Sequence, residues 1–309
     1  MPVSQAVSNK TIVRELMDEI INHHQPAAWD RYASSDFVHY ATLPNIEAGL
    51  AGIKQWSQLV IRAFPDVRGS TQLLLQEADW VVVSVAVTGT HLGNFRGIPS
   101  TTRRIQWNEI HVFKLADGKI QQYFPQVNIG QMMGQLSDRY RVYQPAQSVI
   151  NTLMGAFISE MHRLLPAIKN EKEGQAARIK EVIYRYVEDF KNQQKFLVFP
   201  KLFQPKKFRH HFNFPGCDGT LATFISVGQE FLYAFRDVKV DLIQLIAEGD
   251  YVVEVNQVQA THRRQYFGIA SMGRHVTWQE IHIYRLENER IVENWPGVDF
   301  EHIIHQISL

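Results

Sequence analysis

The sequence predicts an α+β fold that occurs twice along the chain. Two observations lead to this prediction. The 309-residue chain matches itself without a gap when residues 11–136 are laid on residues 182–307. Each segment also begins with stretches of helical periodicity and ends with four stretches of alternating residues rich in Val, Ile and aromatics. Helices followed by a meander of strands are typical of domains in which helices cover one face of a curved antiparallel sheet.

The elements expected in the first copy are an amphipathic helix at 11–24, a short apolar stretch that ends in "FVHY", and a second helix at 49–64. Strands should follow at 67–77, 80–91, 103–115 and 119–127, with a turn at the "ADG" of 116–118. The second copy should place its helices at 182–194 and 220–235, around a stretch that ends in "FRHH".

The repeat sets the domain boundaries, because a period of this length describes a whole domain. We expect a first domain at 1–136, a connector at 137–181 and a second domain at 182–309. Apolar residues at helical spacing predict a helix in the connector, including Ile150, Leu153, Met154 and Phe157.

Composition narrows the class of partner. Lys and Arg number 32 against 31 Asp and Glu, a balance that does not favour nucleic acid or an anionic membrane. A single cysteine, Cys217, excludes an intrachain disulfide and fits a reducing compartment. The N-terminal stretch lacks the apolar core of a signal peptide, and no run approaches the roughly 18 apolar residues of a membrane span. We therefore expect a cytoplasmic protein whose partner is a small molecule or another protein.

Two motifs carry a family resemblance. The run "VAVTGTHLGNFRGIPSTTRRIQWNEIHVFKLADGKI" of the first copy and "IVENWPGVD" of the second resemble the SnoaL-like polyketide cyclase family, also described as predicted ester cyclases, of the nuclear transport factor 2-like superfamily. The resemblance implies cone-shaped domains around an apolar cavity, a polyketide-like carbonyl substrate, an Asp as general acid/base, and no metal or organic cofactor. Members often dimerise through the sheet, so the duplication could form a pseudo-dimer about a twofold axis, and a homodimer is possible.

The family's Trp-x-x-x-Asp motif separates the copies. The second copy has Trp295 and Asp299, whereas the first has Phe124 and Asn128. Because Asn cannot accept a proton, the resemblance makes the second copy the catalytic one if Asp299 is the acid/base group. The alternative is that Asp299 only caps the final helix.

Histidines and a strand motif supply the other candidates. The resemblance points to His262 and His210 as groups that bind substrate oxygen or orient the carboxylate, with His91 and His39 as first-copy counterparts. Trp278, Glu280 and His282 share one face of a strand, as do Trp107, Glu109 and His111. That face could line a cavity, meet another domain or face solvent. A metal site at His262, Glu280 and His282 is disfavoured, because nothing in the spacing fixes its geometry.

Two classes of function stay open from the sequence. The first is a cofactor-independent cyclase or isomerase, with the substrate between Trp278, Trp295 and Asp299; a carboxylate that activates water for epoxide or ester hydrolysis would use the same cavity. The second is a binding or scaffold protein without catalysis. Both copies depart from the family pattern. The second has Arg263, Arg264 and Ala270 within it, and the first has "TTRR" at 101–104 where the family has Thr-Gly-Arg.

Overall fold

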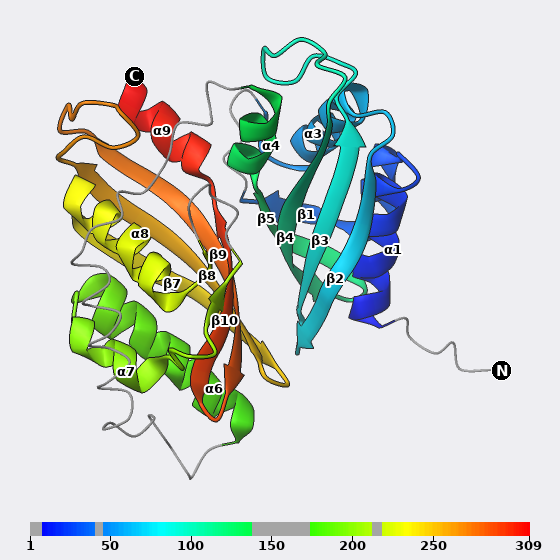
Figure 1. Ribbon diagram of the computed structural model, residues 1–309. Helices are drawn as coiled ribbons and strands as arrows, with labels where there is room; N and C mark the ends of the chain where they lie inside the picture. Colours follow the sequence, from blue (N-terminus) through cyan, green and yellow to red (C-terminus); the bar gives the residue numbers. More distant parts are fainter. Residues whose placement is uncertain (1–7, 41–45, 138–173, 212–217) are drawn as a thin grey trace. The chain divides into compact units, whose positions relative to one another are not determined.

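The computed structural model describes residues 8–40, 46–137, 174–211 and 218–309. The chain divides into two compact units, Met1–Tyr140 and Arg141–Leu309, which Figure 1 shows from blue to red along the sequence. The predicted connector helix around Ile150, and Cys217, lie outside the described residues.

The first unit begins with a helix whose start follows from its sequence. The side chain of Ser8 accepts a hydrogen bond from the N–H of Thr11 at 3.2 Å, which satisfies one of the free donors of the first turn. The unit then contains, in chain order, α1 (Asn9–Ile21), η1 (Pro26–Ala28), α2 (Trp29–Tyr32), β1 (Ala33–His39), α3 (Leu50–Ala63), β2 (Arg68–Glu77), β3 (Trp80–Thr90), β4 (Arg104–Ala116), β5 (Lys119–Val127) and α4 (Ile129–Leu136).

The sheet of the first unit has the strand order β1-β5-β4-β3-β2. The four predicted strands form an antiparallel meander, and β1 pairs in parallel with β5, so that His39 lies beside Tyr123. The α+β class is therefore confirmed, and the sheet is mixed. The strand β1 joins the edge from a helical segment and not through a hairpin, so its direction is not tied to that of its neighbour.

The second unit repeats this plan. Its sheet has the order β6-β10-β9-β8-β7, and His210 of the short strand β6 lies beside Asn294 of β10. The elements are α6 (Gln175–Arg185), the π-helix η3 (Tyr186–Asn192), η4 (Phe196–Val198), α7 (Phe199–Leu202), β6 (Arg209–His210), α8 (Leu221–Ala234), β7 (Phe235–Glu248), β8 (Tyr251–His262), β9 (His275–Glu287), β10 (Arg290–Val298) and α9 (Phe300–Ser308).

The two copies are offset by one residue in their first helices, which corrects the gapless match of the sequence. Asn22 exchanges hydrogen bonds with the backbone of Gly69 at 2.9 and 3.1 Å, and Asn192 does the same with Val240 at 2.8 and 3.1 Å. Gly69 and Val240 match in the gapless repeat, but Asn22 there falls on Gln193. One extra residue before β6 explains the shift, and Lys191 consequently occupies the place of Ile21.

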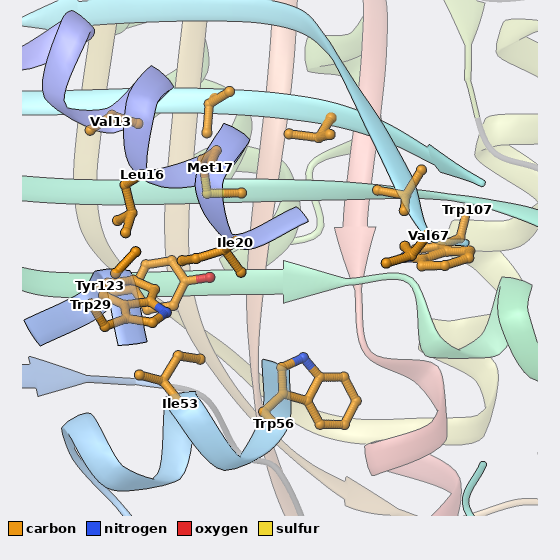
Figure 2. Packing of buried hydrophobic residues seen from close by; sticks show 14 of the residues in the cluster. Val13, Leu16, Met17, Ile20, Trp29, Ile53, Trp56, Val67, Trp107 and Tyr123 are labelled. Atoms are coloured by element: carbon orange, nitrogen blue, oxygen red, sulfur yellow. The ribbon is translucent and has the colours of Figure 1, made fainter. Parts of the chain in front are cut away.

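The two cores differ in continuity. In the first unit a single cluster of buried apolar side chains runs through the space between helices and sheet, and Figure 2 shows Trp29, Ile53, Trp56 and Tyr123 within it. In the second unit the buried apolar residues form two separate clusters.

Each sheet also carries buried apolar side chains outside its core clusters. They occur at matching positions of the repeat: Leu75, Val82, Ile110 and Val112 in the first unit, and Ile246, Val253, Ile281 and Ile283 in the second. The predicted pairing of the two sheets about a pseudo-twofold axis stays a prediction. Within the described segments, no helix has both the length and the apolar character that crossing a membrane requires.

Candidate functional site

A cavity of about 150 Å³ lies in the second unit and is lined by members of both apolar clusters. A water molecule needs only about 10–15 Å³ of such space, so the cavity can hold much more than one. Most of the lining is aliphatic or aromatic, and the polar exceptions are few. Lys191, His210, Glu280 and His282 line it together with, among others, Phe199, Phe224, Val227, Gly228, Phe231, Tyr266, Val298 and Phe300.

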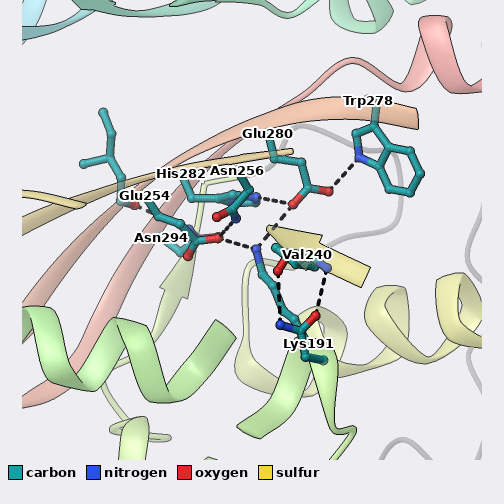
Figure 3. Close-up of polar contacts among 10 residues, drawn as sticks. Lys191, Val240, Glu254, Asn256, Trp278, Glu280, His282 and Asn294 are labelled. Atoms are coloured by element: carbon teal, nitrogen blue, oxygen red, sulfur yellow. Dashed lines mark hydrogen bonds and ion pairs between the residues drawn. The ribbon is translucent and has the colours of Figure 1, made fainter. Parts of the chain in front are cut away.

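Three side chains of β9 form a hydrogen-bonded row beside this cavity (Figure 3). The indole N–H of Trp278 donates to Glu280 Oε1 at 2.9 Å, and Glu280 Oε2 lies 3.1 Å from His282 Nε2. An ionised carboxylate only accepts, so Nε2 of His282 carries a proton, and in the neutral form of the ring the lone pair is on Nδ1. That Nδ1 is buried and has no hydrogen-bond partner in the described part of the chain.

The first unit contains the same row, but there both nitrogens of the histidine have a partner. Trp107 donates to Glu109 at 2.7 Å, and Glu109 lies 2.9 Å from His111 Nε2. The Nδ1 of His111 lies 2.7 Å from the hydroxyl of Tyr123. Both nitrogens of this ring are therefore occupied, whereas Asn294 stands in the second unit at the position of Tyr123.

A lysine and a second carboxylate adjoin the row in the second unit. Lys191 Nζ lies 2.5 Å from Glu254 Oε1 and 3.3 Å from Glu280 Oε2, and Asn256 also donates to Glu254 (Figure 3). The side chain of Lys191 is 11% exposed and that of Glu254 is fully buried. Glu254 Oε2 and Asn256 Oδ1 have no partner among the described residues.

The charges of this group stabilise one another. Burial alone lowers the pKa of Lys191, but the carboxylates of Glu254 and Glu280 outweigh burial and raise it. Burial raises the pKa of Glu280, but the Lys191 ammonium and the hydrogen bonds from His282 and Trp278 outweigh it and hold the pKa below its ordinary range. Lys191 and Glu280 are therefore both charged at neutral pH.

His210 contributes a neutral imidazole to the cavity. Its Nδ1 lies 2.9 Å from Asn294 Oδ1, while the amide nitrogen of Asn294 donates to the carbonyl of Ile283 at 3.4 Å. His210 Nδ1 is then the donor, which leaves Nε2 as the acceptor nitrogen. Burial lowers the pKa of His210 to about 3, so the ring is uncharged at neutral pH.

A family model described as SnoaL-like polyketide cyclase matches the chain twice, over residues 11–136 and 181–307. The chain belongs to this family. Each unit is thus a SnoaL-like domain, and the resemblance noted in the sequence is confirmed.

Individual relatives match one such domain or part of it. Nogalonic acid methyl ester cyclase of Streptomyces nogalater is 32% identical over 99 residues, which cover 30% of this chain and 72% of that protein. Aklanonic acid methyl ester cyclase of Streptomyces peucetius is 38% identical over 48 residues, 16% of this chain and 33% of that protein. Among solved structures, TsrD from Streptomyces laurentii is 22% identical, with a TM-score of 0.38, over 42% of this chain and 98% of its own. A SnoaL-like polyketide cyclase from Agrobacterium tumefaciens is 19% identical, with a TM-score of 0.36, over 42% of this chain and 100% of its own.

Asp299 lies at the start of α9 in the second SnoaL-like domain. Its side chain accepts a hydrogen bond from the N–H of His302 at 3.0 Å, and Asn128 makes the matching bond to Gln131 at 2.9 Å at the start of α4. The lining of the cavity includes Val298 and Phe300 but not the half-buried Asp299 between them. The helix cap anticipated as the alternative is therefore present, and the acid/base role stays a prediction.

The two tryptophans expected beside the substrate are not among the residues that line this cavity. Trp278 is buried in the core behind Glu280 and is not among the lining residues. Trp295 stacks on the ring of His211 at 4.4 Å. Its neighbour Pro296 lines the cavity, so alternation along β10 directs Trp295 to the opposite face of the sheet.

The remaining predicted histidines are also outside this cavity. His262 is fully buried against the ring of Phe235, 5.3 Å between centroids, and His91 in the first domain lies 3.0 Å from the hydroxyl of Thr101. His39 Nδ1 accepts the N–H of Gly49 at 2.8 Å. The structure thus brings together His210, Glu280 and His282 from the predicted set.

Sequence reasoning missed Lys191, Glu254, Asn256 and Asn294. A signal for Glu254 and Asn256 was present in the repeat, because they replace Val83 and Val85 on a strand face that is otherwise apolar. Polar residues that face the core in only one of the two copies are a signal for a functional site in that copy. Among the described residues, no cluster of His, Cys, Asp and Glu suited to a metal ion is present.

Proposed function

We propose that the second domain is the active site of a cyclase or isomerase that acts on a hydrophobic, carbonyl-containing compound of the polyketide kind. Family membership and the names of the two cyclase relatives support this class of substrate. The observation that carries the proposal is the buried, unpartnered Nδ1 of His282, on a ring that lines an apolar cavity and whose other nitrogen is held by a carboxylate.

The chemistry is a proton transfer followed by ring closure. His282 Nδ1 removes a proton from the carbon next to a carbonyl, and Glu280 stabilises the resulting imidazolium. The enolate carbon then forms a bond to a second carbonyl carbon of the same molecule, and that second oxygen takes the proton from His282. Atoms balance, because the product is an isomer of the substrate. Asp299, between the lining residues Val298 and Phe300, is the second candidate for the acid/base role, on the strength of the family motif.

Gly228 offers a direct test, because it lines the cavity and a Cβ built on it meets nothing within 4 Å. Gly228→Phe should fill the cavity without moving the backbone, and should raise the KM or Kd for a cyclase substrate by roughly tenfold or more, about 1.4 kcal/mol. The substrates to try are nogalonic acid methyl ester and aklanonic acid methyl ester, the compounds named for the two relatives.

Gly228→Ala is the matched control. It adds one methyl group to the same helix and should preserve binding and turnover. If Gly228→Phe is folded and turns over these esters as the unmodified protein does, the cavity is not the site.

A binding protein without catalysis is the second candidate, favoured by the capping bond of Asp299. It predicts that the esters bind, that Gly228→Phe abolishes binding, and that no product forms.

A further inference from the structure

The ammonium of Lys191 is the feature of the cavity that the proposed acid/base chemistry leaves unused. An ammonium has three N–H donors. Glu254 and Glu280 are its hydrogen-bonded acceptors, and the ring of Tyr186 lies 5.6 Å from the nitrogen. Lys191 also lines the cavity. One N–H is therefore available for an acceptor that a ligand would bring.

The first domain shows that the fold does not need this charge. Ile21 and Val83 occupy the places of Lys191 and Glu254, and the row of Trp107, Glu109 and His111 forms without them. Burying an ion pair is often no more stabilising than burying apolar side chains of similar volume. Stability alone thus gives no reason for the exchange of Ile and Val for Lys and Glu.

The helix that carries Lys191 is also unusual. The segment Tyr186–Asn192 is a π-helix, whereas the matching end of α1 in the first domain is α-helical. Short π-helical segments occur frequently at functional sites, since they redirect the side chains of one turn.

We infer that Lys191 is a catalytic residue that binds the carbonyl oxygen of the substrate and stabilises the enolate, with Glu254 as the residue that positions it. This inference rests on the proposed function. As His282 takes the proton from carbon, the C–H electron pair becomes the carbon–carbon double bond of the enolate. The carbonyl π electrons move to oxygen, where the negative charge meets the ammonium in a largely apolar space. No oxidant or co-reactant enters this step.

A phenolate imitates the enolate oxygen and gives a readout independent of turnover. The probe is 4-nitrophenol, whose phenol and phenolate forms differ in absorption, bound to the full-length protein and titrated between pH 5 and 9. An ammonium donor should lower the pKa of the bound phenol below that of the free phenol. A hydrogen bond to a charged group is strong enough that its loss should shift this pKa upward by roughly one to two pH units.

The variant must remove the ammonium without leaving an unbalanced charge. Lys191→Met combined with Glu254→Gln removes one charge of each sign and leaves Glu280 with His282, as Glu109 stands with His111 in the first domain. The matched control is Lys195→Met, which removes a positive charge from an exposed ion pair with Asp189, 3.3 Å apart. Gly228→Phe establishes where the probe binds.

The expected result is an upward shift in the double variant, no shift in Lys195→Met, and loss of binding in Gly228→Phe. If the double variant binds 4-nitrophenol with the pKa seen in the unmodified protein, the role of Lys191 is overturned and the cavity remains the site. If the probe fails to bind, or still binds to Gly228→Phe as before, this inference and the proposed function are both overturned.

Discussion

Acidification should destabilise the second domain through His210, and the size of the effect can be worked out from the structure. The ring is 8% exposed, packs 4.9 Å from the ring of Phe224, and has a pKa lowered by burial to about 3. In the unfolded chain the pKa of this histidine returns to about 6.5. Between these values the unfolded state binds a proton that the folded state does not, so the free energy of unfolding falls as the pH falls.

Each pH unit in this window costs about 1.4 kcal/mol for one proton. At pH 5 the loss from His210 is therefore about 2 kcal/mol, and it approaches about 5 kcal/mol below pH 3. Glu280, whose pKa is lowered, loses stabilisation only as the pH falls below the ordinary range of a glutamate. Between pH 7 and pH 5 the free energy of unfolding therefore changes through His210 and not through Glu280.

The assay is urea denaturation at pH 7 and pH 5, read by pulsed hydrogen exchange on peptides of β10 so that the second domain is followed alone. His210→Gln should be less stable than the unmodified protein at pH 7, and this difference should shrink by about 2 kcal/mol at pH 5. His305→Gln, at an exposed position of the same domain, is the matched control for the loss of one histidine. An equal difference at both pH values for His210→Gln would refute the reasoning.

Two further predictions compare residues within the chain. Lys191→Met should destabilise the second domain by about 3–5 kcal/mol in urea denaturation, because it leaves buried carboxylates without their cation, and adding Glu254→Gln should restore most of the loss. The control is Lys54→Met, which breaks an exposed pair with Asp30 at 2.8 Å and should cost less than about 1 kcal/mol. Similar losses for Lys191→Met and Lys54→Met would contradict the argument that burial makes the first pair matter more. Asp299→Asn should preserve the helix cap, since Asn caps as well as Asp, and should slow turnover about 10²-fold if Asp299 is the acid/base group. Asn128→Ala should leave turnover nearly unchanged, and equal effects at the two positions would show that the active domain is wrongly assigned.

Local patterns predicted the strands well. The four predicted strands of the first domain, β2 to β5, begin and end within one residue of the expected positions, because alternation and the turn at Asp117 and Gly118 are properties of neighbouring residues. The shared face of Trp278, Glu280 and His282 was likewise predictable from the period of a strand.

Contacts between distant segments could not be predicted in this way. Whether the face of His282 meets a cavity depends on Asn294 of the next strand and on Lys191 of a helix far away in the sequence. The sequence match also misaligned the helix that carries Lys191 by one residue. The strands of the two copies match without a gap, and this match hid the one extra residue before β6. Only the pairing of Asn192 with Val240 reveals the true correspondence.

The second domain contains a cavity where large side chains of the first domain are replaced by smaller ones. Trp29, Trp56 and Tyr123 fill the first core, as Figure 2 shows, and the matching residues are Phe199, Val227 and Asn294.

The second domain leaves a cavity of about 150 Å³ beside its apolar clusters. The same domain also buries charged groups that the first domain replaces with Ile and Val. The cavity and the buried charges lie in one domain and beside the same histidine, which favours the proposal of a ligand site there over a purely structural role. The first domain keeps the fold and the Trp–Glu–His row, but Tyr123 occupies the imidazole nitrogen that a substrate would need.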